Sequence, residues 1–249
     1  MAGHSKWHNI KFRKERQDAA KGKLFTKLAR ELIVAAREGG ADPEMNIRLR
    51  SAIQAAKDAS MPNDNIERAI KRGSGQLEGV EYVELTYEGY GPGGVAIFIR
   101  VLTDNPKRTV ADIRNIMSKR GGSLGDPNCV AWMFEQKGLI TVEKSKADEE
   151  QLMAIAVEAG ADDLTEEDGA YEITCAPEAF QQVRDALTAS GIEPETASVS
   201  MVPRTLQPLS GDLAEKVLTL MEELEDNDDV QRVYSNFDIP DEIMKARAA

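Results

Sequence analysis

The order of strand and helix patterns between residues 139 and 202 constrains the fold most strongly. Strand patterns alternate with helix patterns in the order βαββαβ, at residues 139–142, 148–159, near 164, 171–175, 177–190 and 196–202. This order is typical of a ferredoxin-like domain, an antiparallel sheet covered by two helices. We therefore expect residues 135–205 to form one α+β domain.

The segments on either side of this unit are incomplete as domains. Before it, residues 82–87 and 95–101 read as a β-hairpin, and a helix begins at Asn105-Pro106. After it come only a helix pattern at 213–224 and a strand pattern at 230–234, too little to fold alone. We expect residues 78–134 and 206–249 to form one discontinuous middle domain into which the ferredoxin-like domain is inserted.

The first 77 residues have a different texture, a non-periodic arm of about 20 residues followed by three helix patterns. The first helix runs over 22–37, and the second takes Asp42 as its N-cap. Asp64 and Glu67 have capping-box spacing at the start of the third, which Gly73 ends. The predicted fold class is a multi-domain α+β protein with an N-terminal three-helix domain and two α+β domains.

Charge is distributed unevenly along the chain, whose net charge is −12. Residues 1–75 hold 16 of the 31 Lys and Arg but only 9 of the 43 Asp and Glu, which leaves 15 cations and 34 anions in the rest. Such polarity indicates an anion-binding segment on an acidic body, and nucleic acid is the expected anion.

The arm interleaves cations with aromatic rings, which suits binding to phosphates and stacking on bases. Its candidate contacts are Lys6, Trp7, Lys11, Arg13, Lys14 and Arg16. The alternative is a solvated N-terminus whose aromatic side chains pack on the helical domain. Most exposed runs of charge are simply solvated, but the interleaved aromatic residues favour nucleic-acid binding.

Two helices add further candidate cations. On the first helix and just before it these are Lys21, Lys23, Lys27, Arg30 and Arg37, and on the helix after Asn105 they are Lys107, Arg108 and Arg114. Most of the first set shares one face, although an ordinary amphipathic surface helix would look the same. Acidic neighbours weaken the case for the second set, and Arg68, Lys71 and Arg72 could simply complement a helix dipole.

Other site patterns are rejected or weak. Gly89, Gly91 and Gly94 match G-x-G-x-x-G, but a strand follows them, so they shape a hairpin and not a dinucleotide site. His4 and His8 lack companion ligands, and the acidic residues at 222–229 read as a solvated helix end, so no metal and no cofactor is expected. No nucleophile and base constellation emerges, which leaves a metal-dependent nucleic-acid enzyme as a remote alternative.

Localisation follows from what the chain lacks. The two cysteines have apolar neighbours and no paired spacing, and no apolar segment is long enough for a membrane span or a signal peptide. We expect reduced core cysteines in a cytoplasmic protein with no membrane partner and no small-molecule substrate. Nothing in the sequence indicates an oligomeric state.

Four blocks of sequence resemble one known family. The opening MAGHSKWHNIK resembles the signature of the YebC/PmpR family, which is related to the mitochondrial translational activator of cytochrome oxidase. YEGYGPGG at 87–94, DNPKRTV at 104–110 and VAWMF at 130–134 resemble further blocks in the expected order, and only the loop at 126–129 departs from the pattern. The resemblance implies three domains, the third inserted into the second.

The resemblance also implies a role in gene expression. Members are described as probable transcriptional regulators that bind promoter DNA, and others as translation factors that act on the ribosome. It implies nucleic-acid contacts at the matching cations Lys6, Lys11, Lys21, Lys23, Lys27, Lys107 and Arg108. We expect a non-enzymatic DNA-binding regulator, with binding to ribosomal RNA and the ribosome as the alternative.

Overall fold

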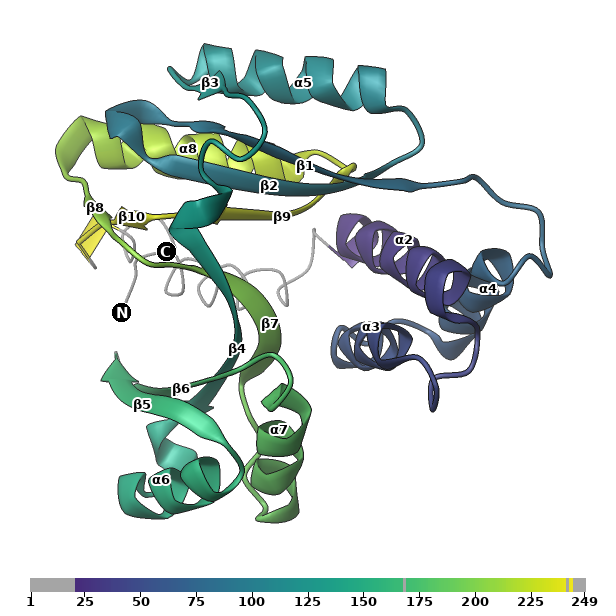
Figure 1. Cartoon of the computed structure of the whole chain (residues 1–249), viewed down its shortest axis with the longest axis vertical. Coiled ribbons are helices and arrows are strands. Elements are labelled where there is room, and N and C mark those ends of the chain that lie inside the picture. Colours follow the sequence, from purple (N-terminus) through teal and green to yellow (C-terminus); the bar gives the residue numbers. More distant parts are fainter. Residues whose placement is uncertain (1–20, 168, 241, 244–249) are drawn as a thin grey trace.

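Three domains are visible in the computed structural model, which describes residues 21–167, 169–240 and 242–243. A helical domain lies beside a sheet that carries two helices, and two long strands connect that sheet to a second sheet with its own two helices (Figure 1). This is the multi-domain α+β fold that the sequence predicts. No helix in the described ranges has the length and apolar character to cross a membrane.

The helical domain consists of α2 (Lys21–Gly39), α3 (Ile47–Asp58) and α4 (Asn63–Gly73). Its core lies where the apolar faces of the three helices meet, with Leu32, Leu49 and Ile66 all buried. All three predicted helices are present. In Figure 1, α2 lies beside the middle domain, and its Lys23 and Arg30 side chains bond to that domain.

Two helix starts differ from the sequence expectation. The N-cap of α3 is Asn46 and not Asp42: the Asn46 amide oxygen accepts from Leu49 N at 3.0 Å, while its amide nitrogen donates to the Ala35 and Gly40 carbonyls. Asp42 instead accepts from Glu44 N within the preceding turn. A buried amide that satisfies two helix ends at once therefore fixes the start of α3, which spacing alone does not reveal.

At α4 the expected capping box is absent. Pro62 occupies the N-cap position, and no side chain caps the helix. The predicted role of Asp64 and Glu67 at this end is therefore wrong, and Asp64 lies inside the first turn.

The middle domain is built from two separate stretches of the chain. The first supplies β1 (Val83–Tyr90), β2 (Ala96–Thr103), α5 (Pro106–Lys119) and β3 (Ser123–Leu124), and the second supplies α8 (Gly211–Asp226) and β9 (Val230–Ser235). The sheet order is β3-β1-β2-β9, with β9 antiparallel to β2. The final large strand therefore completes a sheet that began far earlier in the sequence.

Both helices of the middle domain pack on one face of this sheet. Ile97 and Ile99 of β2 meet Ile113 of α5 and Leu218 of α8 in one core, in which all four are fully buried. On the opposite face, Phe98 packs against Tyr234 and against Phe134, the first residue of the long strand that enters the insertion. The insertion thus begins in contact with its host.

The glycine-rich segment at residues 89–94 forms the β1–β2 hairpin, as predicted from its sequence context. Within the 3-10 turn η1 (Pro92–Gly94), Gly93 and Gly94 have φ of 73° and 76°, a backbone region that favours glycine. Gly89 acts differently, because it lies within β1 where a Cβ would collide with the Ser123 backbone of β3.

Beside Gly89, the Glu88 carboxylate is buried and fixes the loop that leads out of β3. It accepts hydrogen bonds from the backbone N–H groups of Asn128, Val130 and Ala131 at 2.7–2.8 Å. A short 3-10 turn, η2 (Ala131–Met133), then leads into the insertion. Glu88 therefore fixes the loop through which the chain passes from the middle domain to the insertion.

The inserted domain has the predicted ferredoxin-like topology. Its elements are β4 (Phe134–Glu143), η3 (Lys144–Lys146), α6 (Glu149–Glu158), β5 (Ala161–Glu167), β6 (Ala170–Cys175), α7 (Phe180–Ala189) and β7 (Thr196–Pro203). The sheet order β5-β6-β4-β7 is antiparallel throughout, and both helices cover one face, where Ile140, Ile173 and Val183 are buried.

The insertion leaves and re-enters its host at one place. Phe134 of β4 pairs with Pro203 of β7, and a short parallel pair of β8 (Gln207–Pro208) with β10 (Phe237–Asp238) follows on the return. This pairing supports the domain boundaries 1–77, 78–134 with 206–249, and 135–205, which stay predictions.

Candidate nucleic-acid interface

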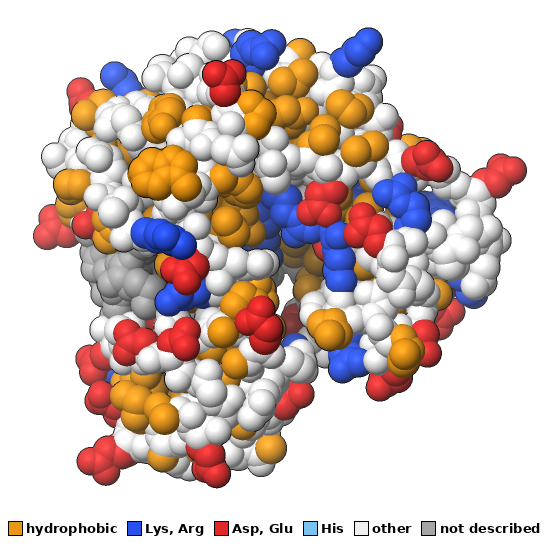
Figure 2. All heavy atoms as spheres, viewed as in Figure 1, with side chains coloured by type: hydrophobic (Ala, Val, Ile, Leu, Met, Phe, Trp, Pro, Cys, Tyr) orange, Lys and Arg blue, Asp and Glu red, His pale blue; other side chains and the backbone are white. Residues whose placement is uncertain are grey.

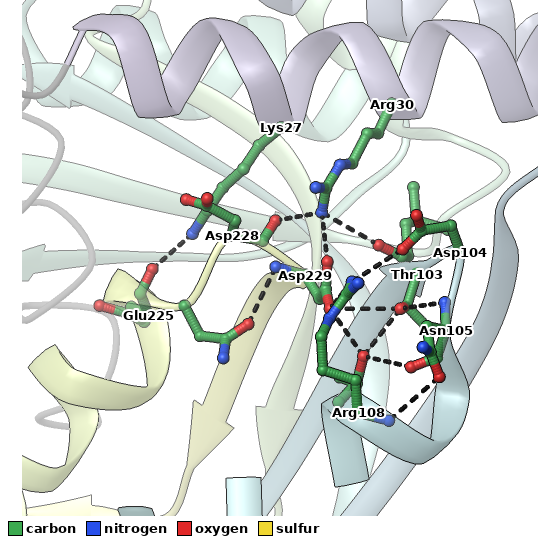
Figure 3. Close-up of polar contacts among 12 residues, drawn as sticks. Lys27, Arg30, Thr103, Asp104, Asn105, Arg108, Glu225, Asp228 and Asp229 are labelled. Atoms are coloured by element: carbon green, nitrogen blue, oxygen red, sulfur yellow. Dashed lines mark hydrogen bonds and ion pairs between the residues drawn. The ribbon is translucent and has the colours of Figure 1, made fainter. Parts of the chain in front are cut away.

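The cations of α2 do not form an open surface. Lys23 Nζ lies 2.6 Å from the Asp226 carboxylate, and Lys27 Nζ donates to the Glu225 carbonyl at 2.5 Å. Both partners belong to the C-terminal end of α8. Figure 3 shows Lys27 and Arg30 pointing from α2 toward the turn between α8 and β9.

Asp229 is the centre of this contact. One oxygen of its carboxylate accepts from Arg30 at 2.8 Å, and the other accepts from Arg108 at 2.8 Å and from the Thr109 hydroxyl at 2.6 Å (Figure 3). The Thr103 hydroxyl adds a longer bond of 3.2 Å. Three elements, α2, α5 and the α8–β9 turn, are thereby joined through one residue that is only 4% exposed.

The electrostatics of Asp229 follow from these partners. Burial acts to raise the pKa of its carboxyl, but the Thr109 hydroxyl and the charges of Arg108 and Arg30 outweigh burial and hold the pKa below its usual range. A depressed carboxyl pKa contributes stability that is present at neutral pH and is lost as the pH falls through the lowered value. The Asp229 cluster thus stabilises the contact between the helical and middle domains at neutral pH.

The sequence interpretation of the acidic residues at 222–229 is wrong. The sequence predicts a solvated helix end here, but Asp229 is buried and the carbonyls of Glu225 and Asp228 accept from α2. Arg30 also donates to Asp228 O at 2.5 Å, and its side chain is only 13% exposed. The pattern could not show this, because the paired residues lie 198 positions apart in the sequence.

Arg108 is likewise engaged within the chain, because it pairs with Asp104 at 2.7 Å as well as with Asp229. Arg37 donates to the Tyr82 carbonyl. In this conformation Arg30, Arg37 and Arg108 therefore contact groups of the chain itself, and their predicted contact with nucleic acid stays a prediction.

Lys107 and Arg114 differ from these residues. Both are exposed on α5, two turns apart, and within the described ranges no ion pair involves either. They are available to an external anion, so their predicted contact with nucleic acid stays a prediction. The arm residues Lys6, Trp7, Lys11, Arg13, Lys14 and Arg16, and the side chain of Lys21, lie outside the described residues.

A second charged cluster connects the C-terminal half of α2 to α3 and to the middle domain. Arg48 of α3 bridges Glu31 and Glu38 of α2 and Glu84 of β1, at 2.7–2.8 Å, and Arg100 of β2 also pairs with Glu31 and Glu84. In Figure 2, blue and red side chains alternate where the helical domain meets the middle domain. These pairs neutralise cations that composition alone would assign to an anion-binding surface.

One cationic feature was ambiguous in the sequence. Arg68 and Arg72 of α4 face a groove between α2 and α4 that Tyr82 and Phe25 also line. Both arginines are exposed. The sequence shows that Arg68 and Arg72 lie one turn apart on a helix. It does not show that Tyr82 lies near them, because Tyr82 belongs to the linker, whose path depends on tertiary packing.

The two cysteines are free thiols. Cys175 belongs to the core of the inserted domain, while Cys129 is half-buried beside the Glu88 loop. Burial raises the pKa of both thiols. A raised pKa lowers the fraction of each thiol that is present as the reactive thiolate.

Comparisons with known proteins cover nearly the whole chain. The family model for the TACO1/YebC protein N-terminal domain matches residues 5–76, and the model for the TACO1/YebC second and third domain matches residues 82–237. The two models meet at the linker between α4 and β1.

Relatives and a solved structure agree with these matches. Proteins named "Probable transcriptional regulatory protein" are 57% identical in Dictyoglomus turgidum, over 99% of both chains, and 55% identical in Natranaerobius thermophilus, over 98% of this chain and 99% of that protein. The crystal structure of the conserved hypothetical protein Aq1575 from Aquifex aeolicus is similar, with a TM-score of 0.81 at 46% identity, covering 90% of this chain and 92% of that one.

Proposed function

Because this chain belongs to the TACO1/YebC family, we propose that it is a non-enzymatic regulator of gene expression that binds nucleic acid in the cytoplasm, with promoter DNA as its first target. The observation that carries the proposal is the polarised charge, with 16 cations against 9 anions in the first 75 residues of a chain whose net charge is −12. The printed name of its relatives, probable transcriptional regulatory protein, supports the choice of DNA.

The contact residues fall into two groups. Arg30 joins the helical domain to the middle domain through the buried Asp229, and Arg108 pairs with the same carboxylate within the middle domain. Turning these arginines to a phosphate would leave a buried charge unpaired. Lys23 differs, because its pair with Asp226 is exposed on both sides and exposed pairs contribute little. We assign phosphate contact to the arm cations, Lys23, Lys107 and Arg114.

The mode of binding would be electrostatic docking along a phosphate backbone. Phosphate contacts fix the position of a protein on its target, while base-edge contacts give sequence preference. Since the assigned residues are Lys and Arg on an arm and on helix surfaces, we expect broad binding with a steep dependence on salt.

The first test measures affinity for labelled duplex DNA over a salt series by fluorescence anisotropy. We expect Lys6→Gln with Lys11→Gln to weaken binding, and to reduce the slope of log K against log salt by about 0.9 for each phosphate that the variant no longer neutralises. Lys107→Gln with Arg114→Gln should do the same.

The matched control is Lys57→Gln with Lys216→Gln, which removes two exposed cations from α3 and α8. It should leave the slope within error of the wild type. Equal slopes for the control and the arm variant would remove the arm from the mechanism.

A second experiment identifies the target. The protein is crosslinked to nucleic acid in cells, and the recovered sequences are determined. Discrete promoter peaks are expected. Recovery dominated by ribosomal RNA would replace the promoter with the ribosome as the site of action.

A further inference from the structure

A groove lies between α2 and α4 in the helical domain. Its volume is about 320 Å³, and its lining includes Phe25, Arg30, Asn65, Arg68, Arg72 and Tyr82. Three arginines line it and, within the described part of the chain, no Asp or Glu does. Arg30 is neutralised by Asp229, so the two arginines of α4 give the groove its excess positive charge, and an anion is the expected occupant.

The arginines of α4 are free to bind that anion. Arg68 and Arg72 lie one turn apart and are exposed, and no ion pair involves either among the described residues. Lys71, between them in sequence, is outside the groove lining and pairs instead with Glu67 at 3.7 Å. The two guanidinium groups that face the groove are thus the uncommitted ones. Paired forks of this kind match the oxygens of a phosphate.

Arg30 also lines this groove. Its Nη1 is committed to Asp229, but its Nε is buried and has no hydrogen-bond partner among the described residues. Arg30 therefore contributes to the wall of the groove, and the exposed guanidinium groups of Arg68 and Arg72 are the donors that a ligand can reach.

The remaining walls are mostly apolar, with Thr26 and Asn65 as their polar side chains. The Arg30 guanidinium lies 5.2 Å from the centroid of the Tyr82 ring, which holds that ring beside the cations, and Phe25 and Ile33 extend the apolar surface. A ligand that suits both features combines a flat ring with an anionic group. The volume is of the size expected for one small-molecule unit and is too small for a helix or a duplex.

We propose that the α2–α4 groove binds one phosphorylated nucleoside unit, with its phosphate on Arg68 and Arg72 and its base against Tyr82. The unit is either a nucleotide within a single strand or a free nucleotide, since the recognition chemistry is shared. The strand form rests on the proposed function and specifies it: the helical domain holds an unpaired base.

The test uses the full-length protein and two kinds of probe. Single-stranded RNA and DNA of about 10 nucleotides are titrated by fluorescence anisotropy, and AMP, adenosine and inorganic phosphate are titrated by calorimetry. Arg68→Gln with Arg72→Gln should lower affinity for the strands and for AMP by about tenfold or more. Tyr82→Leu should weaken AMP binding and leave phosphate binding unchanged.

The control variant, Lys57→Gln with Lys71→Gln, removes two charges from the same domain outside the groove. It should change strand affinity by less than about twofold. Thermal melting of all variants checks that the helical domain stays folded.

The outcomes separate the groove from the wider function. If the wild type binds strands and the groove variant matches the control, the groove proposal is overturned while the proposed function stands. If AMP binds through Arg68 and Arg72 but no nucleic acid binds, the groove is a free-nucleotide site and the proposed function fails. If an acidic peptide competes through these arginines but AMP and phosphate do not, the occupant is a protein and the proposal is wrong.

Discussion

At the scale of single residues, Glu172 is the least expected feature. It lies on β6 opposite Thr141 and Thr165, on the sheet face away from the helices, and is 5% exposed. Its Oε1 has no hydrogen-bond partner among the described residues, and burial raises the pKa of its carboxyl to about 7. The alternating pattern of residues 171–175 predicted this strand but carried no sign that its polar side would also be buried.

We predict that Glu172→Gln removes a pH dependence of stability. The usual pKa of a glutamate is 4.5, so between that value and about 7 the folded state keeps a proton that the unfolded state has released. Stability must therefore fall as pH rises through this window, by about 3 kcal/mol in all. Urea denaturation from about pH 5 to about pH 8 should show this slope in the wild type and lose it in the variant.

The comparison variant for this prediction is Glu158→Gln, which changes an exposed residue at the end of α6. It should retain the wild-type slope. Equal pH slopes for the wild type and Glu172→Gln would contradict the raised carboxyl pKa.

At the scale of elements, the helix and strand types were predictable and their contacts were not. The Asn105 cap of α5 followed from local chemistry, since its side chain accepts from Arg108 N at 3.2 Å and Pro106 follows. That α5, α2 and the α8–β9 turn converge on Asp229 could not be predicted, because the partners are 120 to 199 residues apart. The sequence identified the candidate cations, but it did not identify the carboxylates that form ion pairs with several of them.

We predict that Asp229→Ala destabilises the protein by about 2 to 3 kcal/mol, because it leaves Arg30 buried without its carboxylate. Hydrogen exchange should also accelerate around Arg30 in the middle of α2, where the helix loses its carboxylate contact with the middle domain. Asp226→Ala, in the same region but paired at an exposed position with Lys23, should cost less than about 1 kcal/mol. Equal losses of stability in the two variants would show that burial does not set the strength of this contact.

At the scale of the whole molecule, the insertion was predictable from the order of elements alone. A helix and a strand with no partners after residue 205 had to return to an earlier sheet, and β9 does pair with β2. The placement of the helical domain was not predictable, since it depends on the side-chain clusters around Asp229 and Arg48.

We predict that the inserted domain can be removed without unfolding its host. Gln136 of β4 pairs with Met201 of β7, so an Asn-Gly turn joining these two residues in place of 137–200 would close a hairpin. Phe134 and Met201 stay in contact with the Phe98 face of the middle sheet. Circular dichroism and thermal melting should show a cooperative transition in the shortened chain, and loss of that transition would mean that host and insertion fold as one unit.

The split middle domain also has a consequence for synthesis on the ribosome. Residues 211–235, which supply α8 and β9, are translated after the entire inserted domain. Until they emerge, the nascent chain carries β2 with one edge unpaired and with Ile97 and Ile99 lacking their α8 neighbours. The inserted domain is therefore complete before the middle domain. A messenger RNA truncated within this stretch would yield an intact ferredoxin-like domain attached to an incomplete, aggregation-prone sheet.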